Sequence, residues 1–140
     1  MFELHEALAR DCVFVGDLPL CRLLLMNDSQ YPWLILVPRR ADLREQCDLS
    51  SDDQLLYLQE SNICCGVLRS EFGAEKLNVA ALGNMVPQLH IHHIARFSKD
   101  PAWPKPVWGQ FPALAYTDDR LAALVAQLRE VFAACVELKY

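Results

Sequence analysis

Apolar runs separated by short polar breaks dominate the first quarter of the chain. Two such runs, residues 21–26 and 33–38, flank a polar break at residues 27–30. Runs of this length around a short polar connection are typical of an antiparallel β-hairpin. An earlier apolar run at residues 12–15 precedes a turn signal that contains Gly16 and Pro19. We therefore predict three strands here, the last ending at Pro38, which cannot donate a hydrogen bond to a neighbouring strand.

The hydrophobic period changes after residue 50. Ser51 stands three residues before Gln54, which is the spacing of a capping box, and two aspartates follow Ser51 directly. With Gly73 as a stop signal, this pattern predicts a helix over residues 51–71. A second helix is predicted from Thr117, because apolar residues recur at helical steps from residue 121 to residue 136.

Two strand-like stretches, residues 76–82 and 87–94, lie between these helices. Several strands with two helices and few crossover connections favour an α+β fold with an antiparallel sheet. Residues 98–112 contain four prolines and two tryptophans, so we expect an irregular segment that wraps over the domain or over a partner subunit. The length suits one domain, and we expect a single domain over residues 1–140.

Composition excludes several classes of protein. Hydrophobic residues make up 53% of the chain and charged residues 22%, which excludes a disordered chain. No apolar run approaches the roughly 20 residues that cross a bilayer, and the first residues do not resemble a secretory signal. A formal net charge of -5 argues against a broad basic surface for nucleic acid. The six cysteines lack C-x-x-C spacing, so we expect reduced, buried thiols in a soluble, cytoplasmic protein.

Three of the four histidines fall within four residues, at positions 90, 92 and 93. Strand alternation places Gln88, His90 and His92 on one face and His93 on the other. Three polar side chains on one face of an otherwise apolar strand are costly to bury unless they line a pocket. The row therefore predicts a functional site, although a hydrogen-bonded structural cluster is the alternative.

Metal binding and nucleophilic catalysis are the two chemistries open to this row. A zinc site needs three or four ligands, whereas His93 faces away and no acidic cluster is nearby. A neutral imidazole can instead attack phosphorus directly, while a second polar group on the same face manages the proton of the leaving group. The turn at Gly83 and Asn84 offers backbone N–H groups and a side-chain amide for an anionic phosphate.

Residues 83–94, which read GNMVPQLHIHHI, resemble the signature of the histidine triad (HIT) family. That signature is His-φ-His-φ-His-φ-φ, where φ is apolar, and it usually follows a Gly-Gln pair. The resemblance extends over most of residues 12–110. It implies an α+β, HIT-like fold with a five-stranded antiparallel sheet and packed helices, and often a homodimer.

The resemblance also implies roles for individual residues. His90 takes the place of the nucleophile, and His92 that of the histidine on the phosphate or leaving-group side. Gln88 stands where the first triad histidine normally is, but it keeps the main-chain carbonyl that helps to orient the nucleophile. His93 is expected to be non-catalytic, and Arg96 to be a solvated charge. The nucleotide contacts implied are Asn27 or Asp28 at the ribose, and Asn78 and Asn84 at the phosphate.

Family membership would imply a nucleotide hydrolase or transferase. Such an enzyme cleaves at the α-phosphate of nucleoside phosphoramidates or dinucleoside polyphosphates through a nucleotidyl-histidine intermediate, without a metal or other cofactor. A purine nucleotide is the expected partner. The alternative is a nucleotide-binding module with little or no turnover, which Gln88 and the apolar Met85, at a position often held by a hydroxyl residue, would favour. A metal-binding protein is the third hypothesis, and it predicts sensitivity to a chelator.

Overall fold

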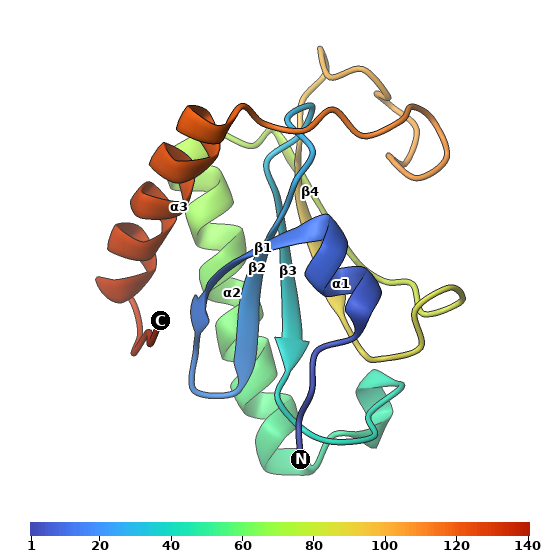
Figure 1. Ribbon diagram of the computed structural model, residues 1–140, viewed down its shortest axis with the longest axis vertical. Coiled ribbons are helices and arrows are strands. Elements are labelled where there is room, and N and C mark those ends of the chain that lie inside the picture. The colour runs from blue at the N-terminus through green and yellow to red at the C-terminus, as the bar shows by residue number, and fades with distance from the viewer.

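The computed structural model describes residues 1–140 and contains one antiparallel sheet of five strands, in the order β1-β2-β3-β5-β4 (Figure 1). This architecture confirms the α+β prediction. The strands are β1 Cys12–Asp17, β2 Cys21–Met26, β3 Trp33–Pro38, β4 Lys76–Ala81 and β5 Ile91–Arg96. The helices are α1 Glu6–Asp11, α2 Ser51–Phe72 and α3 Asp118–Ala133, with a short 3-10 helix at Gln46–Asp48.

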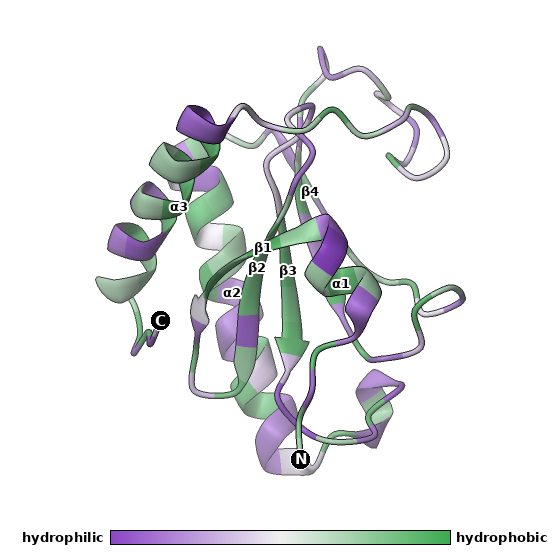
Figure 2. Cartoon of the chain, in the orientation of Figure 1, coloured by the Kyte–Doolittle hydropathy of each residue, from purple (hydrophilic) through white to green (hydrophobic).

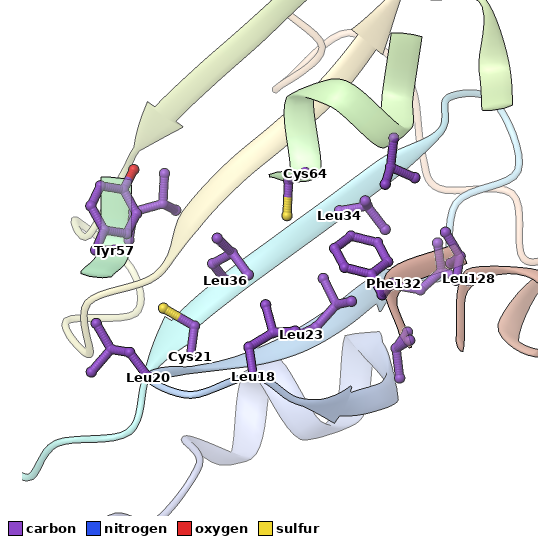
Figure 3. Packing of buried hydrophobic residues seen from close by; sticks show 14 of the residues in the cluster. Leu18, Leu20, Cys21, Leu23, Leu34, Leu36, Tyr57, Cys64, Leu128 and Phe132 are labelled. Carbon is purple, nitrogen blue, oxygen red and sulfur yellow. The ribbon is translucent and has the colours of Figure 1, made fainter. Parts of the chain in front are cut away.

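Side-chain alternation along β3 separates two hydrophobic clusters on opposite faces of the sheet. Leu34 and Leu36 belong to the larger cluster, which packs beneath α2 and α3 (Figure 3). Trp33 and Ile35 point to the other face and join a smaller cluster with α1 and the segment after β5. All six residues of β3 are buried, and Figure 2 colours most of this strand as hydrophobic. Because the period of a strand is two, the sequence of β3 determines which side chains meet on each face.

Both long helices begin and end at recognisable caps. Ser50, one residue before the predicted cap, accepts a hydrogen bond from the N–H of Asp53 and begins α2. Gly73 ends α2 in the left-handed conformation, with φ of 68°, as its stop signal predicts. Thr117 caps α3 as expected, but α3 ends at Ala133, so the last part of its predicted apolar stripe lies outside the helix.

Two regular elements differ from the prediction. The helix α1 was not predicted, because its six residues are too few for a periodic signal. The strand predicted over residues 87–94 begins only at Ile91, where pairing with β4 ends. Before that point, Leu89 donates its N–H to the carbonyl of Leu43 at 3.0 Å, so this part of the chain contacts the loop that precedes α2 and not β4.

The cysteines and the helices also match the expectations from composition in part. All six thiols are free, and Cys12, Cys21 and Cys64 are buried as predicted, whereas Cys47 and Cys135 are exposed. None of the helices combines the length and the apolar character that crossing a bilayer requires.

Residues 98–112 form no helix or strand, as the prolines predict, and are held in place by a buried ion pair. Arg96, at the end of β5, donates to both carboxylate oxygens of Asp100, at 2.8 and 3.0 Å. Both side chains are nearly inaccessible to solvent, at 2% and 3% exposure. Asp100 also accepts N–H groups from Phe97, Ala102 and Trp103. The expectation of a solvated Arg96 is therefore wrong, because this guanidinium anchors the segment from inside.

Candidate active site

A cavity of about 360 Å³ opens on the face of the sheet that lies opposite α2. Its walls come from α1, one end of each of the first three strands, the loop between β4 and β5, the residues at His90 and His92, and the irregular segment after β5. The side chains that line it include Leu8, Asp11, Met26, Trp33, Leu82, Asn84, Met85, His90, His92 and Trp108. A volume of this size lies in the range of small-molecule sites.

His90 is oriented by the main chain just before β5. Its Nδ1 lies 2.7 Å from the carbonyl oxygen of Gln88. A carbonyl can only accept a hydrogen bond, so in the neutral ring Nδ1 carries the proton and Nε2 keeps a free lone pair. The ring is buried, yet it lines the cavity. His90 is therefore held in the tautomer that a nucleophile requires.

His92 lies beside His90, with 5.0 Å between the ring centroids. Its Nδ1 accepts a hydrogen bond from the indole N–H of Trp33 at 3.0 Å, and Trp108 packs edge-on against its ring at 5.1 Å. Burial, and to a lesser degree the neighbouring His90 and His93, lowers the pKa of His92 to about 3. His92 is therefore neutral throughout the physiological pH range.

His93 lies on the opposite face, as strand alternation predicts. Its Nε2 is 2.7 Å from the hydroxyl of Ser61 on α2, and its Nδ1 is 3.1 Å from the carbonyl of Ile91. Burial lowers the pKa of His93 to about 4, although the hydrogen bond to Ile91 opposes this change. His93 thus connects β5 to α2 and has no contact with the cavity. No group of three His, Cys, Asp or Glu side chains is arranged to hold a metal ion.

The side chain of Gln88 does not share the cavity with the two histidines, contrary to the strand-based expectation. Its amide makes two hydrogen bonds of 2.8 Å to the N-terminal segment, donating to the carbonyl of Glu3 and accepting the N–H of His5. These bonds imitate the pairing of a peptide unit with a neighbouring strand. His5 in turn caps α1 through the N–H of Ala7. Gln88 lies outside the regular strand β5, so its side chain is free of the alternation of that strand. It holds the N-terminal segment, which leads into α1 and so into one wall of the cavity, against the residues before β5.

Replacing Gln88 with Ala is expected to release the N-terminal segment while leaving His90 correctly oriented. Two hydrogen bonds are lost, which should lower the free energy of unfolding by about 1 to 2 kcal/mol. The carbonyl that orients His90 belongs to the main chain and remains. Hydrogen exchange should therefore accelerate at the amide of His5. The exposed Gln110, whose side chain makes no hydrogen bond within the chain, provides the control Gln110→Ala. Unchanged protection of the His5 amide would contradict this role.

The amide side chains expected at the phosphate are divided between two places. Asn84 lines the cavity beside His90 and His92. Asn78 does not line it, since its Oδ1 accepts a hydrogen bond from the guanidinium of Arg96 at 2.8 Å. The interpretation of Asn78 as a phosphate ligand therefore lacks support from its position. An amide at this position of β4 is explained by its hydrogen bond to Arg96, without a bound phosphate.

Asn27 and Asp28 line a second cavity of about 490 Å³, which adjoins the first. Asp11, Met26, Trp33 and Trp108 line both cavities. One oxygen of Asp28 accepts hydrogen bonds from Gln30 and from the N–H of Leu114, whereas its other oxygen has no partner within the chain. Asn27 accepts the N–H of Tyr116. Both residues thus fix the segment before α3, and Asp28 retains an acceptor for a bound molecule.

Sequence reasoning missed α1 and Trp33, and it placed Trp108 only in an irregular segment that wraps over the domain or over a partner subunit. The position of Trp33 was readable in part. It stands two residues before Ile35, and Ile35 pairs with His92, so the hairpin and the histidine strand place Trp33 on the histidine face. Trp108 follows no strand register. The buried ion pair after β5, together with the packing of Ala102 and Val107 in the smaller cluster, holds its segment over the sheet.

Comparison with known proteins identifies the family. Residues 8–99 match the family model of the HIT domain. The chain belongs to the histidine triad family. A histidine triad protein from Marinobacter aquaeolei VT8 is 48% identical, with a TM-score of 0.93 over 96% of this chain and 98% of that one. Histidine triad proteins from Sinorhizobium meliloti 1021 and Bradyrhizobium japonicum are also similar. Their respective values are 45% and 43% identity, TM-scores of 0.90 and 0.89, 93% and 92% of this chain, and 96% of each of theirs.

The comparison with curated proteins found no match. Membership of the HIT family indicates nucleotide hydrolase or transferase activity.

Proposed function

We propose that this HIT protein is a single-domain enzyme that cleaves nucleoside phosphoramidates or dinucleoside polyphosphates at the α-phosphate, with His90 as nucleophile. The observation that carries the proposal is the hydrogen bond of 2.7 Å from His90 Nδ1 to the Gln88 carbonyl. It leaves an unprotonated Nε2 in a cavity of about 360 Å³. Attack by a neutral imidazole nitrogen needs no base to activate it.

The two adjoining cavities suggest how the substrate is bound. The α-phosphate would occupy the cavity of His90, His92 and Asn84, where hydrogen-bond donors can stabilise negative charge. The nucleoside, a purine nucleoside in this proposal, would lie in the second cavity. There the free oxygen of Asp28 would accept the ribose hydroxyl groups, with Asn27 beside it. Trp33 and Trp108, which border both cavities, would provide apolar contact for the base.

The proposed reaction has two steps. His90 Nε2 forms a bond to the α-phosphorus, and the bond from phosphorus to the amine nitrogen breaks. The amine leaves with a proton taken from the solvent, and the nucleotidyl-imidazolium keeps its Nδ1 proton on the Gln88 carbonyl. A water molecule then attacks phosphorus, the bond to His90 breaks, and nucleoside monophosphate and one proton are released. Water is consumed and the amine is freed, so the atoms balance.

The proposal is tested by AMP release from adenosine 5′-phosphoramidate in excess EDTA. Release at an unchanged rate, together with a protein mass increased by one nucleotidyl group in quenched reactions, is expected. Turnover without any covalent adduct under single-turnover conditions would count against His90 as the nucleophile. Tight binding of AMP with no hydrolysis would favour the binding-module alternative. Loss of activity in EDTA would favour a metal site.

A further inference from the structure

The hydrogen bond between Trp33 and His92 restricts which nitrogen of His92 can carry a proton. The indole Nε1 lies 3.0 Å from His92 Nδ1. An indole N–H can only donate, so Nδ1 must offer its lone pair and the proton of a neutral His92 must reside on Nε2. This nitrogen pair lies in the buried part of the site, where both side chains are at most 6% exposed. Water therefore has little access to replace the indole as the partner of Nδ1.

The position of Trp33 is fixed by strand register and by aromatic packing. Trp33 on β3 pairs with Ile94 on β5, and Ile35 pairs with His92, so Trp33 and His92 are diagonal neighbours on one face. The indole also contacts the rings of Tyr31 and Trp108 edge-on, with centroids 6.3 and 6.0 Å away. An indole held on three sides cannot easily turn its N–H away from His92.

We propose that Trp33 is a positioning residue that holds His92 as a neutral hydrogen-bond donor, with its proton on Nε2, facing the phosphate. His92 then stabilises the phosphoryl oxygens and does not transfer protons. The proposal rests on the proposed function for its catalytic part only. The protonation state of His92 follows from the chain itself and can be measured without a substrate.

In this arrangement His92 can neither lose its proton nor gain a second one at neutral pH, so it cannot act as an acid or a base. Loss of the Nε2 proton from a neutral ring would leave an imidazolate, which is far too basic to form at neutral pH. Gain of a second proton at Nδ1 would place the N–H of His92 against the indole N–H of Trp33, and the hydrogen bond between them would be lost. Burial, which lowers the pKa of His92, acts in the same direction. The proton on the departing amine therefore comes from the solvent.

Few other ionisable groups surround His92. Asp11 on α1, Cys12 at the start of β1 and His90 line the same cavity. His93 is next to His92 in sequence on the opposite face, and Tyr31 lies beyond Trp33. The loop between β4 and β5 and the segment around Trp108 contribute no charged side chain to the cavity. Asp11 is thus the one carboxylate that could favour a charged His92, and it provides a control position.

The test is an NMR measurement of the imidazole nitrogen shifts and their pH titration, in protein with isotope-labelled histidine. Wild type, Trp33→Phe and Trp108→Phe are compared. Trp108→Phe is the matched control, because it removes an indole that packs on His92 without removing a hydrogen bond to it. Asp11→Asn tests whether that carboxylate affects the titration.

In wild type and in Trp108→Phe, His92 Nδ1 is expected to be unprotonated and Nε2 protonated from pH 5 to 8. In Trp33→Phe, His92 should gain its second proton about one pH unit or more higher than in wild type, because Nδ1 becomes free to bind it. A proton on Nδ1 of wild-type His92 would overturn the proposal, and this outcome does not require any variant to fold. Identical titrations of His92 in wild type and Trp33→Phe would overturn it as well.

Turnover supplies the catalytic part of the test. In Trp33→Phe, kcat should fall roughly 10- to 100-fold, the size observed when the partner that orients a functional histidine is removed. KM should change less, and the pH profile of kcat should acquire an ionisation that wild type lacks. If wild type shows no turnover, the proposed function fails while the NMR result still decides the state of His92. An unchanged kcat in Trp33→Phe would overturn the catalytic role alone.

Discussion

Replacement of His90 by Ala is expected to abolish AMP release from adenosine 5′-phosphoramidate. The proposed mechanism forms its only covalent bond to the protein at His90 Nε2. Without it the first step has no nucleophile, and the second step has no intermediate for water to attack. His92 cannot take over, because its Nδ1 is occupied by Trp33 and its Nε2 carries the proton. We expect kcat to fall at least about a thousandfold, as for other nucleophile deletions. The covalent adduct should disappear from quenched reactions.

The neighbouring His93 supplies the control for this experiment. His93→Gln changes a histidine in the same strand that contacts Ser61 and lies away from the cavity. A glutamine amide can still reach the Ser61 hydroxyl, so we expect a folded protein with turnover close to wild type. If His90→Ala and His93→Gln reduced activity equally, the loss would reflect damage to β5. The assignment of His90 as nucleophile would then fail.

Replacement of Arg96 by Met is expected to lower the free energy of unfolding by about 3 to 5 kcal/mol, because it leaves a buried carboxylate without its partner. Arg96 and Asp100 are 2% and 3% exposed, and the guanidinium also donates to Asn78 and to the carbonyl of Lys105. Chemical denaturation monitored by circular dichroism measures the change. Within the folded protein, the greatest gain in mobility is expected in the segment that carries Trp108 over the cavity.

A surface pair of the same geometry shows how much of this effect is due to burial. Arg40 also makes two hydrogen bonds to a carboxylate, that of Asp53, but its side chain is 45% exposed. Arg40→Met should therefore cost less than about 1 kcal/mol. Equal losses in the two variants would show that burial of the Arg96 pair contributes nothing.

Acid should remove part of the stabilisation by the Arg96 pair. Burial alone would raise the pKa of Asp100, but the hydrogen bonds from Arg96, with those from the backbone, lower it below its ordinary value. A carboxyl group with a lowered folded pKa stabilises the fold above its unfolded pKa, near 4, and loses this contribution as the pH falls through the folded value. The stability difference between wild type and Arg96→Met should therefore be largest at high pH. It should shrink as the pH falls, first where Asp100 is protonated in the variant, in which burial without the guanidinium raises its pKa, and then down to the lowered pKa of wild type.

The fold was predictable from sequence wherever an apolar run or a helical period was long enough to read. The hairpin of β2 and β3 and the strand β4 are apolar runs of strand length, and both long helices have periodic apolar positions, so all were found. The helix α1 and the start of β5 were not, since six residues give no period and Leu89 bonds to a loop that is distant in sequence. Local pattern alone contains no information about such a partner.

The candidate site divides in the same way. His90, His92 and Asn84 belong to the motif at residues 83–94, and the structure brings their side chains to one cavity. Gln88 was placed by strand alternation and Asn78 by the family resemblance, but their partners are Glu3 and His5 for Gln88, and Arg96 for Asn78. Neither kind of reasoning identifies these partners. Polar residues next to a motif thus hold the walls of this site, while apolar and aromatic residues form much of its surface.

The arrangement of Trp33 and Trp108 around His92 also gives the protein a built-in optical reporter. The chain has three tryptophans, and two of them border both cavities, whereas Trp103 lies outside them over the guanidinium of Arg96. Indole fluorescence depends strongly on the polarity and ring contacts of its surroundings. A nucleotide that enters either cavity changes the surroundings of two of the three emitters. Occupancy can therefore be followed by intrinsic emission, without a label, in the same sample that is assayed for turnover.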